Sequence, residues 1–240
     1  MATFERDDIS ISYDTHGDGF PVLLIAPGGM RSAAAVWHNM PLNPIEQLSP
    51  SYRVVAMDQR NAGSSAAPIT ADDGWATYTT DQLALLDHLG IDQFHVVGMC
   101  IGGSYIAALI KAAPERVRSA VVMQTIGVDE NRNAFYEMFD SWAADIKGDH
   151  PEVDEATWAS FRSNMYDAEP FLFTAGDADV AAMATPLLLL MGNDLYHPES
   201  SSRRWAELSP NATLIEEWKE EPARGEAIAA MDAFLASNTP

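Results

Sequence analysis

Short apolar runs that stop at turn residues constrain this sequence more than any other feature. Segments of this kind cover residues 21–26, 52–57, 94–99, 118–124 and 187–191, and each has a mainly apolar centre. Each is too short for a typical helix and does not alternate between apolar and polar residues. That pattern is typical of strands buried on both faces of a sheet. Residues 9–13 and 212–218 predict two further strands, each less apolar than the other five.

Segments with helical spacing separate these runs. Apolar residues recur on one helical face in 71–90, in the segment directly after Cys100, and towards the carboxyl end of the chain, and 199–208 is predicted to be a further helix. Strands that alternate with helices predict a parallel sheet with helices on both faces. We therefore predict an α/β fold with a mostly parallel central sheet.

The alternation is interrupted between residues 127 and 185. This stretch is rich in Phe, Trp, Tyr and Met at helical spacing and contains no strong strand before Pro186. We predict a helical insert at 127–185 within a core formed by 1–126 and 186–240. Aromatic residues at this spacing usually form packed core, and some would line a pocket if the insert covers the strand ends.

Composition narrows the choice of partners. The 240 residues include 35 acidic and 14 basic side chains, a formal net charge of −21. Nucleic acids and anionic membranes require a basic surface, so neither is an expected partner. A small-molecule substrate is expected, and a homodimer is compatible with the sequence.

One cysteine, Cys100, excludes an intramolecular disulfide. No apolar run approaches the roughly 20 residues that span a bilayer, and the first ten residues lack the features of a signal peptide. We therefore expect the protein in the cytoplasm.

The segment around Cys100 is the most informative for function. Gly98-Met99-Cys100-Ile101-Gly102-Gly103 lies between a predicted strand and a predicted helix. A Gly-x-nucleophile-x-Gly pattern there indicates a chain reversal so sharp that side chains at the flanking positions would clash. The positive end of the following helix would stabilise a thiolate at Cys100, and the Ile101 N–H could donate to an oxyanion. The alternative is that Cys100 is a small buried apolar residue.

Four segments together resemble the α/β-hydrolase fold family over nearly the whole chain. They are Pro27-Gly28-Gly29-Met30, Met57-Asp58-Gln59-Arg60-Asn61-Ala62-Gly63-Ser64-Ser65, the turn at Cys100, and Gly192-Asn193-Asp194. The insert lies where that family places its cap. Most members have serine at the position of Cys100, and cysteine followed by this glycine pattern resembles the dienelactone hydrolases.

The resemblance implies roles for several residues. Two backbone N–H groups would form an oxyanion hole, one from Ile101 and one from Gly29 or Met30. The position of the catalytic acid falls on Asp194, whose alternative role is a turn or helix-cap residue. The family's usual histidine follows the last strand, but no histidine occurs after His197 in this sequence.

The base must therefore come from elsewhere. His197 lies three residues after Asp194 at the expected edge of the sheet, and we prefer it; His38 is a second candidate, and His150 could lie over the site. His197 could instead cap the next helix. Glu220 or Glu221 could accept a proton in the loop that lacks the histidine. Asp58 and Arg60 are expected to fix the turn after their strand.

These residues predict an enzyme that cleaves a small ester, lactone or thioester. Cys100 would be the nucleophile, His197 the base and Asp194 the residue that orients it. A thiol is partly ionised at neutral pH and depends less on a strong base than a hydroxyl does. No cofactor and no metal is expected, because no metal-ligand spacing is present. Because the usual histidine is absent, the alternative is a non-hydrolytic member: a ligand-binding protein, a lyase or a cyclase.

Overall fold

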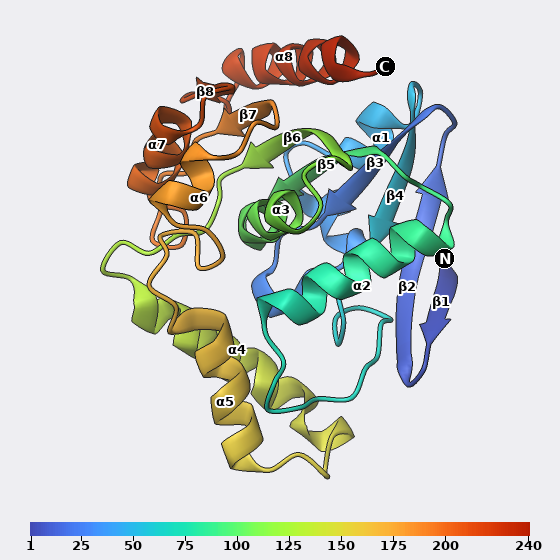
Figure 1. The fold of residues 1–240 in the computed structure, drawn as a ribbon, viewed down its shortest axis with the longest axis vertical. Coiled ribbons are helices and arrows are strands. Elements are labelled where there is room, and N and C mark those ends of the chain that lie inside the picture. The colour runs from blue at the N-terminus through green and yellow to red at the C-terminus, as the bar shows by residue number, and fades with distance from the viewer.

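The computed structural model describes residues 1–240 and is built on one eight-stranded sheet (Figure 1). The strands are β1 (Ala2–Arg6), β2 (Ile9–His16), β3 (Phe20–Ile25), β4 (Tyr52–Met57), β5 (Phe94–Met99), β6 (Val117–Met123), β7 (Leu187–Leu190) and β8 (Ala212–Ile215). Their order across the sheet is β1-β2-β4-β3-β5-β6-β7-β8. The pairs β1–β2 and β2–β4 are antiparallel, and every other pair is parallel. This confirms the predicted mostly parallel sheet.

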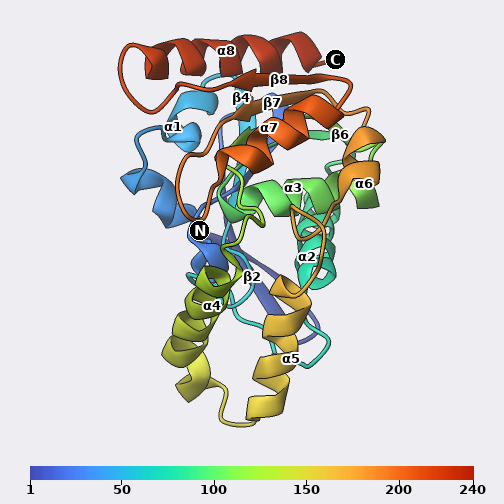
Figure 2. The ribbon, with the colours of Figure 1, turned by 90° about the vertical axis from the view of Figure 1, so that its left-hand side faces the viewer.

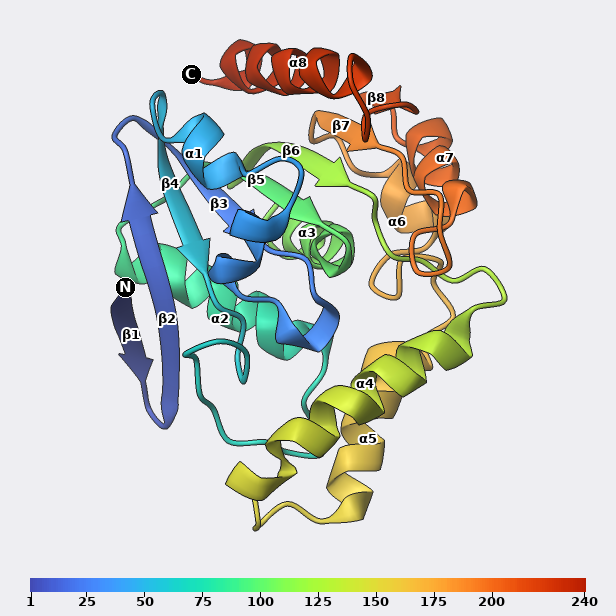
Figure 3. The ribbon, with the colours of Figure 1, turned by 180° about the vertical axis from the view of Figure 1, so that it is seen from behind.

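Helices cover both faces of the sheet (Figures 1 and 3). The α-helices are α1 (Pro44–Leu48), α2 (Trp75–His88), α3 (Ile101–Ala112), α4 (Arg132–Ile146), α5 (Glu155–Tyr166), α6 (Asp177–Ala181), α7 (Glu199–Leu208) and α8 (Ala223–Asn238). Short 3-10 helices are η1 (Gly29–Arg31), η2 (Ala34–Asn39) and η3 (Lys147–Asp149). Side chains of α2, α3 and α7 belong to one apolar cluster, and those of α1 and α8 to another.

Strand β3 shows why the central runs are continuously apolar. Leu23 and Ile25 face the cluster formed with α2 and α3, whereas Val22 and Leu24 face the cluster formed with α1 and α8. Successive side chains of a strand point to opposite faces, so a strand covered on both faces must be apolar at every position.

The structure differs from the sequence-based expectation at several places; for example, β2 continues to His16 rather than ending at residue 13. Strand β1 was not predicted, because only one of its residues, Phe4, is buried. Helix α2 begins at Trp75 rather than near residue 71, since the Asp73 carboxylate accepts the Thr70 N–H at 2.8 Å and forms a turn. Strand β8 ends at Ile215 rather than 218, although Trp218 beyond it is buried.

The segment between β6 and β7 is mainly helical. Helices α4 and α5 run side by side and project from the end of the sheet (Figure 2), and α6 follows before β7. Aromatic side chains of α4 and α5 pack on one another and on α2. No helix in the structure combines the length and apolar character needed to cross a membrane.

A buried ion pair fixes the loop after β4. Arg60 donates to both oxygens of Asp81 on α2, at 2.7 and 3.1 Å, and lies 3.3 Å from Asp73. The Arg60 and Asp81 side chains are 5% and 1% exposed. Asp58 accepts the N–H groups of Ala34 and Ser64 at 2.8 Å. Arg60 and Asp58 therefore both make hydrogen bonds that hold the turn after β4, the structural role expected from the sequence.

We predict that Asp81→Ala lowers the free energy of unfolding by about 3–5 kcal/mol, because it removes the main partner of a buried guanidinium. Asp145→Ala is the control. Asp145 pairs with Arg31 in an exposed position, where such a pair contributes no more than about 1 kcal/mol. Urea denaturation measures both changes. Equal losses for the two variants would contradict the importance of the buried pair.

Candidate active site

Cys100 forms a strained turn between β5 and α3. Its backbone has φ 61° and ψ −117°, a region that residues with side chains rarely adopt. Its N–H donates to Met123 O at 3.0 Å, and its carbonyl accepts from Gly103 and Ile126 at 3.1 Å. Hydrogen bonds to the neighbouring strand β6, to helix α3 and to the loop after β6 thus hold the strained backbone of Cys100 in place.

The glycines around Cys100 are required by close packing. A Cβ at Gly98 would lie 3.1 Å from Gly102 Cα, so the strand and the helix approach too closely for a side chain there. A Cβ at Gly103 would lie 2.1 Å from Thr125 Oγ1. These contacts agree with the physical reason for glycine on both sides of the turn.

The Cys100 side chain is half-buried at the carboxyl end of β5. Backbone N–H groups of Gly28 and Ile101 lie against its sulfur. Burial raises the pKa of the thiol, but contact with His197, the positive charge of that ring and the two N–H groups lower the pKa by more, so it lies below the usual value. The sulfur is therefore poised to ionise.

The loop after β3 supplies the second set of backbone N–H groups. Gly28 and Gly29 both have positive φ, 119° and 59°. A Cβ at Gly29 would lie 2.1 Å from the sulfur of Met138, so α4 packs directly on this loop. The N–H of this loop that lowers the pKa of Cys100 is that of Gly28, one residue before the predicted donors Gly29 and Met30, which begin η1.

His197 and Asp194 form a tight pair in the loop after β7. His197 Nδ1 lies 2.7 and 2.9 Å from the two carboxylate oxygens of Asp194. Because Nδ1 is occupied, the nitrogen left for proton transfer is Nε2, which is buried and has no hydrogen-bond partner. The structure therefore brings together Cys100, His197 and Asp194.

The loop that carries this pair is held in shape by its own backbone. Asp194 Oδ1 also accepts the N–H groups of Tyr196 and His197, at 3.0 and 3.1 Å. Asn131, just before α4, donates to Leu195 O at 2.7 Å. A Cβ at Gly192 would lie 2.5 Å from His197 Cβ, so glycine lets the ring approach the sheet.

The two partners have opposite pKa shifts. Burial lowers the pKa of His197, but contact with Cys100 and Asp194 and their negative charges raise the pKa by more. Burial raises the pKa of Asp194, whereas its bonds to His197 and to the loop N–H groups lower the pKa overall. Both shifts favour a thiolate–imidazolium pair with an ionised carboxylate behind it.

The other histidines lie away from Cys100. His38 is exposed on η2, a 3-10 helix, and contacts Asn43 at 3.3 Å. His150 lies beside Trp158 and Glu152 at the far end of the α4–α5 pair. His95 is buried between Ser119 and Thr239, where burial and Arg118 lower its pKa to about 4. None of the three is brought to the sulfur.

The loop after β8 contains other side chains where the family's histidine is expected. Trp218 is buried and donates from Nε1 to Met191 O at 2.8 Å. Lys219 contacts Asn193, next to Asp194. Glu220 and Glu221 are exposed and lie near Arg224. This loop supports the loop that carries His197.

Aromatic side chains lie between the helical segment and the site. Phe135 of α4 stacks on Tyr166 of α5, with ring centroids 5.5 Å apart, and contacts Tyr196, the neighbour of His197. Tyr166 Oη lies 3.6 Å from the sulfur of Met30. Sequence analysis named these aromatic residues only as a group, because helical spacing does not say which of them faces the strand ends.

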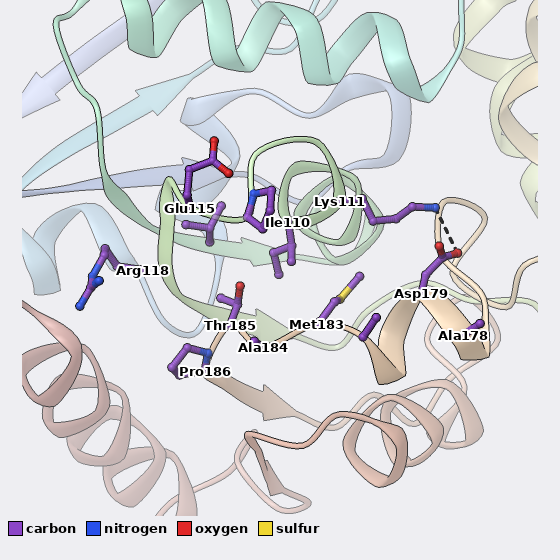
Figure 4. A pocket seen from close by; sticks show the side chains of 13 residues that line it. Ile110, Lys111, Glu115, Arg118, Ala178, Asp179, Met183, Ala184, Thr185 and Pro186 are labelled. Carbon is purple, nitrogen blue, oxygen red and sulfur yellow. Dashed lines mark ion pairs between the residues drawn. The ribbon is translucent and has the colours of Figure 1, made fainter.

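A pocket of about 640 Å³ lies at the opposite edge of the sheet (Figure 4). It is bordered by the starts of β6 and β7 and by the end of α3. Lys111 crosses to Asp179 at 3.1 Å and also donates to Thr174 O. Ligands of open parallel sheets usually bind at the carboxyl ends of the strands, where Cys100 lies, and this pocket is at the amino ends.

Comparison with known proteins agrees with the fold. Residues 21–169 match the family model described as alpha/beta hydrolase fold, and the chain belongs to that family. It is 28% identical to 2-hydroxymuconate semialdehyde hydrolase of Pseudomonas putida, over 87% of this chain and 84% of that protein. It is 34% identical to the Mycobacterium tuberculosis protein BpoC over 55% of this chain, and thus spans about half (50%) of that relative.

Solved structures show the same fold. A mutant of the meta-cleavage product hydrolase CumD superposes with a TM-score of 0.74 at 24% identity, over 98% of each chain. Further relatives include a carboxylesterase of Bacillus subtilis and, at the level of fold, an enol-lactonase of Burkholderia xenovorans. The relatives that these comparisons name are thus mainly hydrolases and esterases.

We predict that iodoacetamide alkylates Cys100 with a midpoint below pH ~8.5, the usual pKa of a free thiol. His197→Ala removes the contact and charge that lower this pKa and leaves the burial that raises it, so the midpoint should rise. Mass spectrometry of the single cysteine measures the rate across pH. A wild-type midpoint at or above ~8.5 would contradict an activated thiol.

We also predict that Gly192→Ala raises the alkylation midpoint of Cys100 without unfolding the protein. The new Cβ would meet His197 and push the ring from the sulfur. Gly148→Ala is the matched control, because a Cβ there meets no atom within 4 Å. The same alkylation profile is measured for both. An unchanged midpoint in Gly192→Ala would show that the ring's position does not depend on this glycine.

Proposed function

We propose that the protein hydrolyses a small ester, lactone or thioester, with Cys100 as the nucleophile. The observation that carries this proposal is a half-buried thiol whose pKa is lowered by His197, a histidine with Nδ1 paired to a carboxylate and Nε2 unpartnered. The relatives named as hydrolases and carboxylesterase support the same reaction class. Cysteine in place of the family's usual serine remains part of the proposal, as does the likeness to dienelactone hydrolases.

In the first step, the Cys100 sulfur attacks the substrate carbonyl carbon. The carbonyl electron pair moves to oxygen, which Ile101 N–H and an N–H of the Gly28–Met30 loop stabilise. The intermediate collapses when the leaving oxygen or sulfur takes the Nε2 proton of His197. The product of this step is a thioester of Cys100.

In the second step, neutral His197 removes a proton from water, which attacks the thioester. The thiolate leaves and restores the ion pair with protonated His197. Asp194 holds Nδ1 in both steps and stabilises the imidazolium. These side chains complete the reaction without a cofactor.

The helical segment at 127–185 is proposed to be the cap that encloses the substrate. Its residues nearest the site are Phe135 and Tyr166, and Met138 packs on the Gly28–Met30 loop. An apolar enclosure of this kind favours a small, uncharged acyl group and excludes water from the thioester.

We predict that wild-type protein turns over p-nitrophenyl acetate repeatedly and that Cys100→Ala reduces the rate to background. His197→Ala should lower kcat by about 10²–10⁴-fold, the usual contribution of a general base. His38→Ala is the control, since that ring is exposed and its hydrogen-bond partner is Asn43. Release of p-nitrophenol, followed by absorbance, measures all four proteins.

Two outcomes would reject the hydrolase. A single burst equal to the enzyme concentration, without further turnover, would show that water does not release the acyl group. No reaction with esters or thioesters would favour the alternative of a ligand-binding protein, lyase or cyclase. The absence of histidine from the loop after β8 is the observation on which that alternative rests.

A further inference from the structure

Tyr166 presents an almost unused hydrogen-bond donor near the candidate site. Its side chain is fully buried at the end of α5. The only partner of its hydroxyl is the sulfur of Met30, at 3.6 Å. A thioether is a weak acceptor, and buried hydroxyls normally have a stronger one.

The position of the hydroxyl is fixed by the surrounding structure. Arg132 of α4 donates to the backbone carbonyls of Tyr166 and Ala168, which ties the end of α5 to the start of α4. The ring stacks on Phe135 and meets Trp75 edge-on at 6.0 Å. The phenol is thus held rigidly, while the Met30 side chain that it contacts is flexible and can be displaced.

Tyr166 connects with both sides of the candidate site. Met30 follows the Gly28–Gly29 turn whose N–H lies against the Cys100 sulfur. On the other side, Phe135 links the Tyr166 ring to Tyr196, next to His197. An acyl group attached to Cys100 beneath this aromatic cover would therefore pass close to the hydroxyl.

We propose that Tyr166 is a specificity-determining residue whose hydroxyl donates a hydrogen bond to a neutral oxygen in the acyl chain of the substrate. This inference rests on the proposed hydrolysis and narrows its substrates to oxygen-bearing acyl groups, such as alkoxy, hydroxy or keto acyl groups. The substrate oxygen replaces Met30 as acceptor.

The acceptor is neutral because of the charges around it. Burial raises the pKa of Tyr166, and the charges of ionised Tyr78 and Cys100 would raise it further, which keeps the phenol protonated. A carboxylate at the same place would be repelled by that thiolate. The positive ring of His197 is already paired with Asp194, and Arg132 is bonded to two carbonyl oxygens, so neither cation is free to hold a substrate carboxylate.

The experiment compares p-nitrophenyl methoxyacetate with p-nitrophenyl butanoate, which differ by an oxygen in place of one methylene group. We expect Tyr166→Phe to lower the ratio of kcat/KM for the two esters by about three- to tenfold, the contribution of one neutral hydrogen bond. The intrinsic reactivities of the esters cancel when the variant's ratio is divided by that of the wild type.

Tyr105→Phe is the matched control. Tyr105 is also fully buried, its hydroxyl has no partner, and it packs on the same Trp75, but it does not contact Met30. We expect its ester ratio to equal that of the wild type. A Tyr166→Phe ratio that is unchanged, or a Tyr105→Phe ratio that falls equally, would overturn the inference.

A binding measurement separates this inference from the proposed hydrolysis. In the Cys100→Ala background, quenching of tryptophan fluorescence gives the Kd of each ester with and without Tyr166→Phe. The same three- to tenfold loss of preference is expected. If wild-type protein hydrolyses neither ester, the hydrolysis is rejected, while the Kd ratios still decide the role of Tyr166; unchanged ratios reject that role.

Discussion

The chain reversal at Cys100 is the constraint on which the site and much of the core depend. Residues held in sparsely populated backbone regions cost about 1–3 kcal/mol and persist only when the surroundings determine them. Here the Met123 carbonyl of β6 accepts the Cys100 N–H. The surrounding atoms lie so close to Gly98 and Gly103 that neither position has room for a Cβ. The packing that orders the central strands also holds the thiol at their carboxyl ends.

The pairing of His197 with Asp194 within one loop is the main departure from the arrangement that the family resemblance implies. The usual histidine would follow the last strand, so acid and base would come from separate loops. Here the proposed base and acid are three residues apart, and one carboxylate accepts hydrogen bonds from both the ring and two backbone N–H groups. The pair is therefore organised locally, and β8 with Trp218 and Lys219 serves to support it.

The helical segment after β6 is coupled to the site through several contacts. Asn131 bonds to the loop of His197, and Met138 covers Gly29. Phe135 and Tyr166 add aromatic surface between these two points. A change in the position of α4 would thus shift both the loop that carries His197 and the Gly28–Gly29 loop. In the proposed function, this couples the enclosure of a substrate to the reacting groups.

Much of the fold followed from local pattern. Strands β4 and β5 and helix α7 have the bounds that their sequence indicates, because continuous apolar runs and helical spacing reflect burial directly. Strand β1 was missed because its pairing with β2 depends on backbone hydrogen bonds rather than on an apolar face. The glycines around Cys100 indicated the turn, because only a sharp reversal requires them.

The sequence by itself determined the class of fold, the turn at Cys100 and the absence of histidine after the last strand. Only the tertiary structure decided that His197 and the Gly28 N–H lower the pKa of Cys100, and that Tyr166 is the phenol beside Met30. The physical reason is the distance along the chain over which each feature acts. Burial and local strain constrain neighbouring residues and so produce a periodic pattern or a choice of glycine, whereas contacts between loops far apart in the chain produce no local pattern.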